Sequence, residues 1–177
     1  MVSDKLPSRE QALQLLRENQ CSPKVIKHCK AVAKLAVETA EACTEKGLKV
    51  DSELVEIGAL LHDIGRSKAH SVHHAVIGAG ILKAAGLPEP VVSIIKKHVG
   101  GGITANEAKQ LGWLKDVYAP VTLEEKIVSY ADKLIGNAKR VPIEETLKEL
   151  ASKHGQDAAE RALKIHKEIE QLIGEYP

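Results

Sequence analysis

The chain has 177 residues, of which 44% are hydrophobic, and its 25 Lys and Arg residues nearly balance 24 Asp and Glu residues, for a formal net charge of +1. This length suits one domain with a sizeable core, and the hydrophobic content excludes a disordered chain. The balanced charge gives no whole-chain signal for nucleic-acid binding, and no apolar run approaches the ~18 residues of a membrane span.

Helix signals dominate from the start of the chain, and we find no alternating pattern typical of a strand. Ser8 and Gln11 have the spacing of a capping box, which predicts a first helix after Ser8. Ser22 followed by Pro23 is a favourable beginning for a second, long helix, which we expect to reach about Lys46 and to stop at the glycine after it.

Three further helices are expected in the middle of the chain. Ser52 can cap the first, and an alanine-rich second helix begins near His73 and ends at Gly86. Pro88 opens the third, and the three glycines at 100–102 end it. We interpret these glycines as a plain helix stop, although bare backbone amides there could also approach a substrate.

The last third of the chain is also predicted to be helical. Thr104 with Glu107, and Thr122 with Glu125, form two more capping boxes. Residues 142–174 read as a hairpin of two charged helices that packs onto the core or onto a second subunit. The sequence therefore predicts an all-α fold of seven to nine helices in one domain, residues 1–177.

Ionisable side chains stand where leucine would be expected on three helices. His28, His62 and Asp132 each lie on or beside an apolar stripe of helical spacing. A buried aspartate is costly unless it is paired or binds a metal. A lone inward histidine such as His28 is more often a hydrogen-bonded core residue, and Asp132 alone could pair with a lysine. A convergent set from distant segments indicates metal ligation instead.

The run from Leu60 to Gly65 reads Leu-Leu-His-Asp-Ile-Gly and resembles the defining motif of the HD superfamily of metal-dependent phosphohydrolases. The resemblance covers about residues 23–137 and implies an HD-domain helical bundle. The four-part family pattern falls in order at His28, His62, Asp63 and Asp132.

The segment that begins at His74 and continues through Gly78-Ala79 resembles dinuclear members of the superfamily, and His98 resembles their next histidine. By this resemblance one metal would take His28, His62, Asp63 and Asp132, and another would take His74 and His98, with Asp63 bridging. The family's cyclic dinucleotide phosphodiesterases carry another histidine where this chain has Val99, so the dinucleoside polyphosphate hydrolases are the better comparison.

A mixed nitrogen and oxygen ligand set suits one or two divalent transition-metal ions, Fe, Mn, Co, Ni or Zn, better than Mg or Ca. Asp63 and Arg66 are the predicted catalytic residues, and Arg66, Lys68 and His73 the predicted substrate contacts. Arg66 is a good bidentate phosphate donor, but it could equally be a solvated surface arginine. His70 is expected to be a loop residue.

Other charged groups are expected to face solvent: Lys96, Lys97, His154 and His166. Three cysteines without metal-ligand spacing are expected to be reduced thiols, and the N-terminus lacks the pattern of a signal peptide, so we expect a cytoplasmic location.

The functional prediction is hydrolysis of a phosphate ester or anhydride, of a nucleotide or dinucleotide, by metal-activated water. The alternative is a non-catalytic regulatory module that binds a metal or nucleotide. A small phosphate substrate is the expected partner; a homodimer is possible, and a membrane or nucleic-acid partner is not expected.

Overall fold

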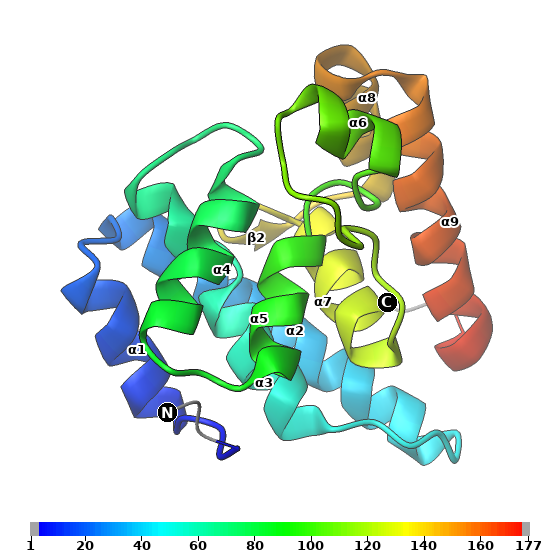
Figure 1. The fold of residues 1–177 in the computed structure, drawn as a ribbon. Coiled ribbons are helices and arrows are strands. Elements are labelled where there is room, and N and C mark those ends of the chain that lie inside the picture. The colour runs from blue at the N-terminus through cyan, green and yellow to red at the C-terminus, as the bar shows by residue number, and fades with distance from the viewer. Residues whose placement is uncertain (1–3, 175–177) are drawn as a thin grey trace.

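The computed structural model describes residues 4–174 and is built almost entirely of helices (Figure 1). The ends of the predicted domain, residues 1–3 and 175–177, lie outside the described residues. The α-helices are α1 (Arg9–Glu18), α2 (Pro23–Glu45), α3 (Ser52–Leu61), α4 (His74–Ala84), α5 (Glu89–Lys97), α6 (Ala105–Gln110), α7 (Leu123–Lys133), α8 (Ile143–His154) and α9 (Gln156–Ile173), and a short 3-10 helix η1 (Ile64–Ser67) follows α3.

The predicted helix beginnings are largely confirmed. Ser8, Thr104 and Thr122 each cap a helix in a complete capping box, and Ser22 caps α2 with proline in its first turn. One cap was wrong: the side chain of Asp51 accepts the hydrogen bond from Leu54 N, and Ser52 is the first helical residue of α3.

Two very short strands were not predicted. β1 (Ile135–Gly136) and β2 (Lys139–Arg140) pair antiparallel around a turn whose central residues, Asn137 and Ala138, both have positive φ angles of 48° and 59°. Two residues per strand are too few to produce an alternating pattern, so the sequence carries no strand signal here.

The core lies where α2, α3, α5 and α7 meet, with α4 packed against α5 and η1. Aliphatic side chains such as Leu60, Ile94 and Ile127 are fully enclosed there. The three cysteines are buried and free. Within the described residues, no helix is both long and apolar enough to span a membrane.

The C-terminal hairpin packs onto the core of the same chain. Ile165 and Ile169 of α9 are buried against α7 and α2, whereas α8 packs against α9 and has no buried residue (Figure 1). The prediction that His166 faces solvent was wrong, because its ring is buried and stacks on Tyr130 at a centroid distance of 5.2 Å.

The expected exposed pair of lysines at the end of α5 is also not exposed. The Lys97 side chain is 11% exposed, and its Nζ lies 2.8 Å from the buried Glu125. Lys96 pairs with Asp116 at 2.6 Å. Each lysine has a carboxylate partner on a segment far along the chain, and the local sequence pattern cannot reveal such partners.

The glycines at 100–102 do more than end α5. A side chain at Gly101 would collide with the backbone of α9 at Arg161 and Ala162, and one at Gly102, where φ is +97°, would collide with Ala119. The interpretation as a plain helix stop was therefore incomplete, because close approach of α9 to this loop requires glycine.

Candidate metal centre

Six side chains from five parts of the chain converge on one point. His28 projects from α2, His62 and Asp63 stand between α3 and η1, His74 begins α4, His98 follows the last residue of α5, and Asp132 lies in α7. Four of the six residues lie at helix termini: His62, Asp63, His74 and His98. A side chain at a helix terminus can face the centre without being part of the helix's apolar stripe. The structure thus brings together all six predicted ligands.

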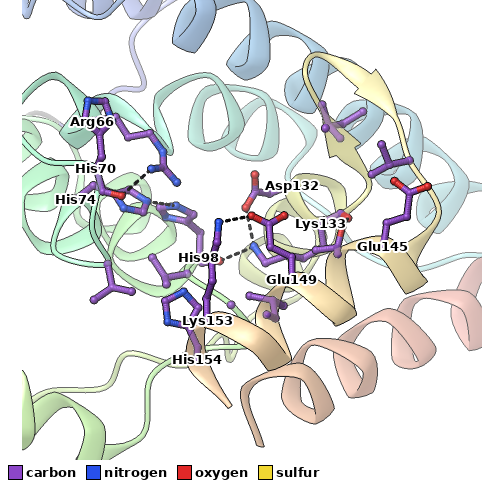
Figure 2. A pocket seen from close by; sticks show the side chains of 18 of the residues that line it. Arg66, His70, His74, His98, Asp132, Lys133, Glu145, Glu149, Lys153 and His154 are labelled. Carbon is purple, nitrogen blue, oxygen red and sulfur yellow. Dashed lines mark hydrogen bonds and ion pairs between the residues drawn. The ribbon is translucent and has the colours of Figure 1, made fainter. Parts of the chain in front are cut away.

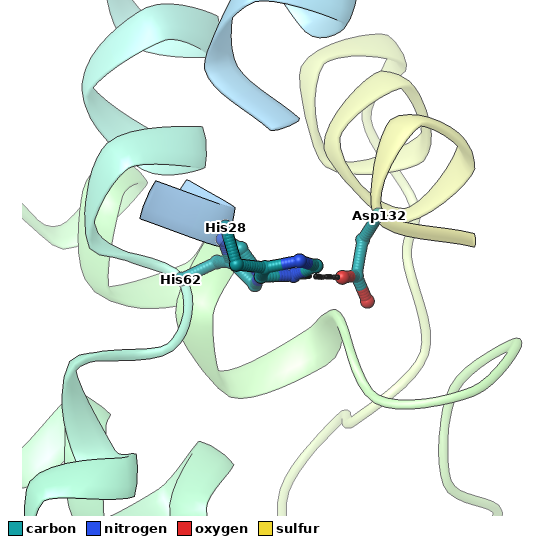
Figure 3. Close-up of side chains that lie close together, drawn as sticks. All are labelled: His28, His62 and Asp132. Atoms are coloured by element: carbon teal, nitrogen blue, oxygen red, sulfur yellow. Dashed lines mark hydrogen bonds and ion pairs between the residues drawn. The ribbon is translucent and has the colours of Figure 1, made fainter. Parts of the chain in front are cut away.

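The first group of ligand atoms surrounds Asp132 (Figure 3). Its Oδ1 lies 3.0 Å from Nε2 of His28 and 3.3 Å from Nε2 of His62. Asp63 Oδ2 lies 3.6 Å from His62 Nε2 and 3.8 Å from His28 Nε2. The ligand atoms of His28, His62 and Asp132 are close enough together to share one cation.

The second group lies on the other side of Asp63. Its Oδ1 is 3.2 Å from Nε2 of His74 and 3.5 Å from Nε2 of His98. The two histidine nitrogens are 3.0 Å apart (Figure 2). Asp63 therefore presents one carboxylate oxygen to each group, as a bridging ligand would.

The backbone sets the tautomer of three of the histidines. Nδ1 of His62, His74 and His98 lies 2.6–2.7 Å from the carbonyl oxygens of Ala59, Ser71 and Ile95, respectively. A carbonyl only accepts, so each Nδ1 carries a proton, and each ring, when neutral, directs the lone pair of Nε2 toward the centre. Such carbonyl partners are typical of metal-ligating histidines.

These atoms fit a cation better than they fit each other. His62 Nε2 and Asp63 Oδ1 are buried without a hydrogen-bond partner. With both Nδ1 atoms protonated, His74 Nε2 and His98 Nε2 are two acceptors that face each other at 3.0 Å. Buried polar atoms left without partners are costly, and a bound divalent ion would satisfy all of them.

The charges in the centre follow from burial and close partners. Burial alone would raise the pKa of Asp63, but His62, His74 and His98 hold it well below its usual value. Burial lowers the pKa of His98 to about 4, so this ring is neutral at physiological pH. Burial opposes protonation of His62 too, yet Asp63 and Asp132 raise its pKa well above the usual value.

Lys133 is a site residue that the sequence reasoning missed. Its side chain is 10% exposed, and its Nζ lies 2.6 Å from Asp132 Oδ2 and 3.3 Å from the backbone oxygen of His98 (Figure 2). Together with His62, it holds the pKa of Asp132 well below the usual value against the effect of burial. Only its position beside Asp132 in the sequence hinted at this role.

Two pockets meet at the centre. One, of about 550 Å³, extends from His74 and His98 to the charged face of α8, which contributes Glu145, Glu149, Lys153 and His154 (Figure 2). The other, of about 670 Å³, runs from His28 along the start of α2 to the β1–β2 turn. The residues common to both pockets are Arg66, His70, Asp132, Ile135 and Asn137.

The predicted substrate contacts divide into two kinds. Arg66 borders both pockets and donates from Nε to Asp63 Oδ2 at 2.8 Å and from Nη1 to His70 O at 3.2 Å. Lys68 is exposed, and His73 accepts a hydrogen bond from Trp113 Nε1 at 2.9 Å; neither borders the two central pockets. His70, expected to be only a loop residue, borders both.

Residues 25–137 match the family model described as HD domain. Since the match covers more than half of the chain, the protein belongs to the HD superfamily of metal-dependent phosphohydrolases. The matched segment agrees with the predicted 23–137 and contains all six convergent side chains.

At least three relatives cover nearly the whole chain. Uncharacterized protein MJ0778 of Methanocaldococcus jannaschii is 45% identical over 93% of this chain and 98% of its own length. A tRNA (cytidine(56)-2'-O)-methyltransferase of Thermoplasma volcanium is 42% identical over 96% of this chain, which spans 49% of that protein. The second relative thus contains a further segment about as long as this chain.

The HD domain of the Listeria monocytogenes phosphodiesterase PgpH, in a crystal structure with cyclic-di-AMP, has a similar fold. The TM-score is 0.54 at 20% sequence identity, over 94% of this chain and 99% of that one. At this identity the likeness concerns the fold, and it confirms the predicted all-α HD-domain bundle.

Proposed function

We propose that the protein is a metal-dependent phosphohydrolase that cleaves a phosphate ester or anhydride of a nucleotide or dinucleotide. The observation that carries the proposal is the complete ligand set, with His62 Nε2 and Asp63 Oδ1 buried and without partners, at the junction of two pockets. A substrate with a group on each side of its phosphate would have room on both sides of the centre.

The six side chains would hold one or two divalent transition-metal ions. His28, His62, Asp63 and Asp132 form one ligand group, and His74 and His98 form the other, with Asp63 shared. A bound ion supplies a water nucleophile at neutral pH and positive charge for the phosphate oxygens.

The chain's own residues orient these groups. Lys133 binds Asp132 Oδ2, which leaves Oδ1 directed at the histidines. Arg66 holds Asp63 Oδ2, and its guanidinium faces the space shared by the pockets, where it can donate to a phosphate oxygen. Lys68 and His73 remain predicted substrate contacts, and they would need a substrate that extends beyond the two pockets.

The test is Asp63→Ala, with Asp157→Ala in the exposed first turn of α9 as the matched control. We expect Asp63→Ala to lose both bound metal and hydrolysis of phosphodiesters and nucleotides, with an unchanged helical circular dichroism spectrum. The control should retain all three. Retained turnover in Asp63→Ala would overturn the proposal.

A non-catalytic regulatory module is the second candidate. The observation that favours it is that a protein named for methyl transfer contains a segment 42% identical to this chain. Binding of metal and nucleotide without turnover, in Mn²⁺, Co²⁺ and Ni²⁺ alike, would favour this candidate over the enzyme.

A further inference from the structure

A third cavity, of about 220 Å³, opens beside the pocket that holds His74 and His98. We call it the side cavity; it lies between α6, α8, α9 and the glycine loop. The residues that border both it and the larger pocket are Val72, Val99, Gly100, Leu150 and His154. Because the two share these walls, the side cavity adjoins the pocket that holds His74 and His98.

Its lining combines apolar walls with a few polar groups. The aliphatic side chains are Val72, Val99, Ile103, Leu111, Leu150 and Ala158, and the polar ones are Glu107, Gln110, His154 and Arg161. Pockets for whole drug-sized ligands measure about 300–1,000 Å³, so this cavity suits a smaller fragment. A nucleobase has apolar faces and a polar edge, which match this lining.

Ion pairing and close packing hold the walls of the side cavity in place before any ligand binds. Arg161 Nη2 of α9 donates to both carboxylate oxygens of Glu107 at 2.8 and 2.9 Å, and its Nε donates to Gly102 O at 3.3 Å. Gly101 leaves no room for a side chain against α9. These contacts join α6, the glycine loop and α9. The cavity walls are therefore ordered before a ligand binds, and binding would cost little free energy for ordering them.

We infer that the side cavity is the subsite for the nucleobase of the substrate, next to the phosphate at the metal centre; the inference rests on the proposed function. Two of its walls, α8 and α9, lie outside the segment matched by the HD family model, residues 25–137. The cavity would therefore select this chain's substrate among compounds that share the same phosphate chemistry.

The test fills the cavity with a larger side chain. Leu111→Trp adds bulk to a half-buried wall residue that borders only the side cavity, and Leu114→Trp is the control at a position 84% exposed. Equilibrium binding of adenosine, guanosine, cytidine and uridine is measured against ribose, because none of these probes contains a phosphate to be cleaved.

We expect the wild type and Leu114→Trp to bind one or more of the nucleosides about tenfold or more tightly than ribose. We expect Leu111→Trp to lose this preference. Equal binding of nucleosides and ribose, or a preference that survives in Leu111→Trp, would overturn the inference.

Turnover supplies a second readout. In Leu111→Trp, kcat/KM for a nucleotide should fall at least about tenfold, and kcat/KM for methyl p-nitrophenyl phosphate, which has no base, should not change. An equal fall for both substrates would contradict a base subsite. Wild-type protein that prefers a nucleoside but hydrolyses no phosphate would contradict the proposed function and leave the subsite standing.

Discussion

The ammonium group of Lys133 lies 2.6 Å from Oδ2 of Asp132, and the other oxygen of that carboxylate lies 3.0 Å from Nε2 of His28. Lys133 thus binds one oxygen of the Asp132 carboxylate, and the other oxygen faces His28 and His62. Loss of an outer partner of this kind typically weakens metal binding about 10–100-fold.

Replacing Lys133 with methionine should therefore weaken metal binding about 10–100-fold, because Asp132 would lose the partner that orients it. Metal affinity, measured by competition with a chromophoric chelator, is the readout. Lys126→Met is the control: Lys126 lies in the same helix but pairs with Glu168 near the surface at 2.8 Å. Equal affinity in wild type and Lys133→Met would contradict a role in orientation.

Metal affinity should increase with pH over the neutral range. In the metal-free protein the carboxylates of Asp63 and Asp132 raise the pKa of His62, so its ring holds a proton that an incoming ion must displace. The dissociation constant should fall by up to about tenfold per pH unit below that pKa. His98, with its pKa of about 4, releases no proton in this range. Calorimetry in buffers of different ionisation enthalpy counts the released protons, and a count of zero would contradict the assignment.

The buried ion pair between Lys97 and Glu125 should stabilise the fold above acidic pH. Burial alone would raise the pKa of Glu125, but hydrogen bonds from Lys97, Val121 N and Ser93 hold it below its usual value. This contribution is present above the unfolded-state pKa and disappears as the pH falls through the folded-state pKa.

Glu125→Gln should accordingly lower the free energy of unfolding by about 1–3 kcal/mol at pH 7, and by less at pH 4. Urea denaturation at both pH values measures the difference, with the exposed Glu53→Gln as control. A loss of stability that is larger at pH 4 than at pH 7 would contradict this account of the pair.

The contact between the glycine loop and α9 predicts that Gly101→Ala is destabilising by about 1–3 kcal/mol, since its methyl group would collide with the α9 backbone. Gly80→Ala, in α4, meets open space and should be neutral or slightly stabilising. Thermal denaturation of the two variants compares them directly. Similar melting temperatures would show that α9 shifts to accommodate the added methyl group, and would contradict this prediction.

The helices and the convergence of the six side chains could be predicted because both leave local signals in the sequence, and the role of the six as metal ligands stays a prediction. Capping boxes such as Thr122 with Glu125 mark helix starts, and the residues around His62-Asp63 carry a family motif. The sequence did not reveal contacts between distant segments. His166 lies among charged residues in the sequence, and only the fold shows that its ring stacks on Tyr130.

The surroundings of the centre were hidden for the same reason. Lys133 and His70 line the site because the fold brings α7 and the loop before α4 together at the pockets. Conversely, Lys68 and His73 are near His62-Asp63 in sequence but are directed elsewhere by the chain's path after η1. For Lys68 and His73, proximity in sequence did not bring proximity at the site.

The most direct test of the central claim is the number of metal ions bound per chain in the purified protein, measured alongside hydrolysis of a generic phosphodiester and a nucleotide panel in Mn²⁺, Co²⁺ and Ni²⁺. We predict close to two ions per chain in the active protein, falling to one or fewer in His74→Ala. Protein that binds no metal and hydrolyses no phosphate under any of these conditions would contradict the assignment of the six side chains as a metal centre.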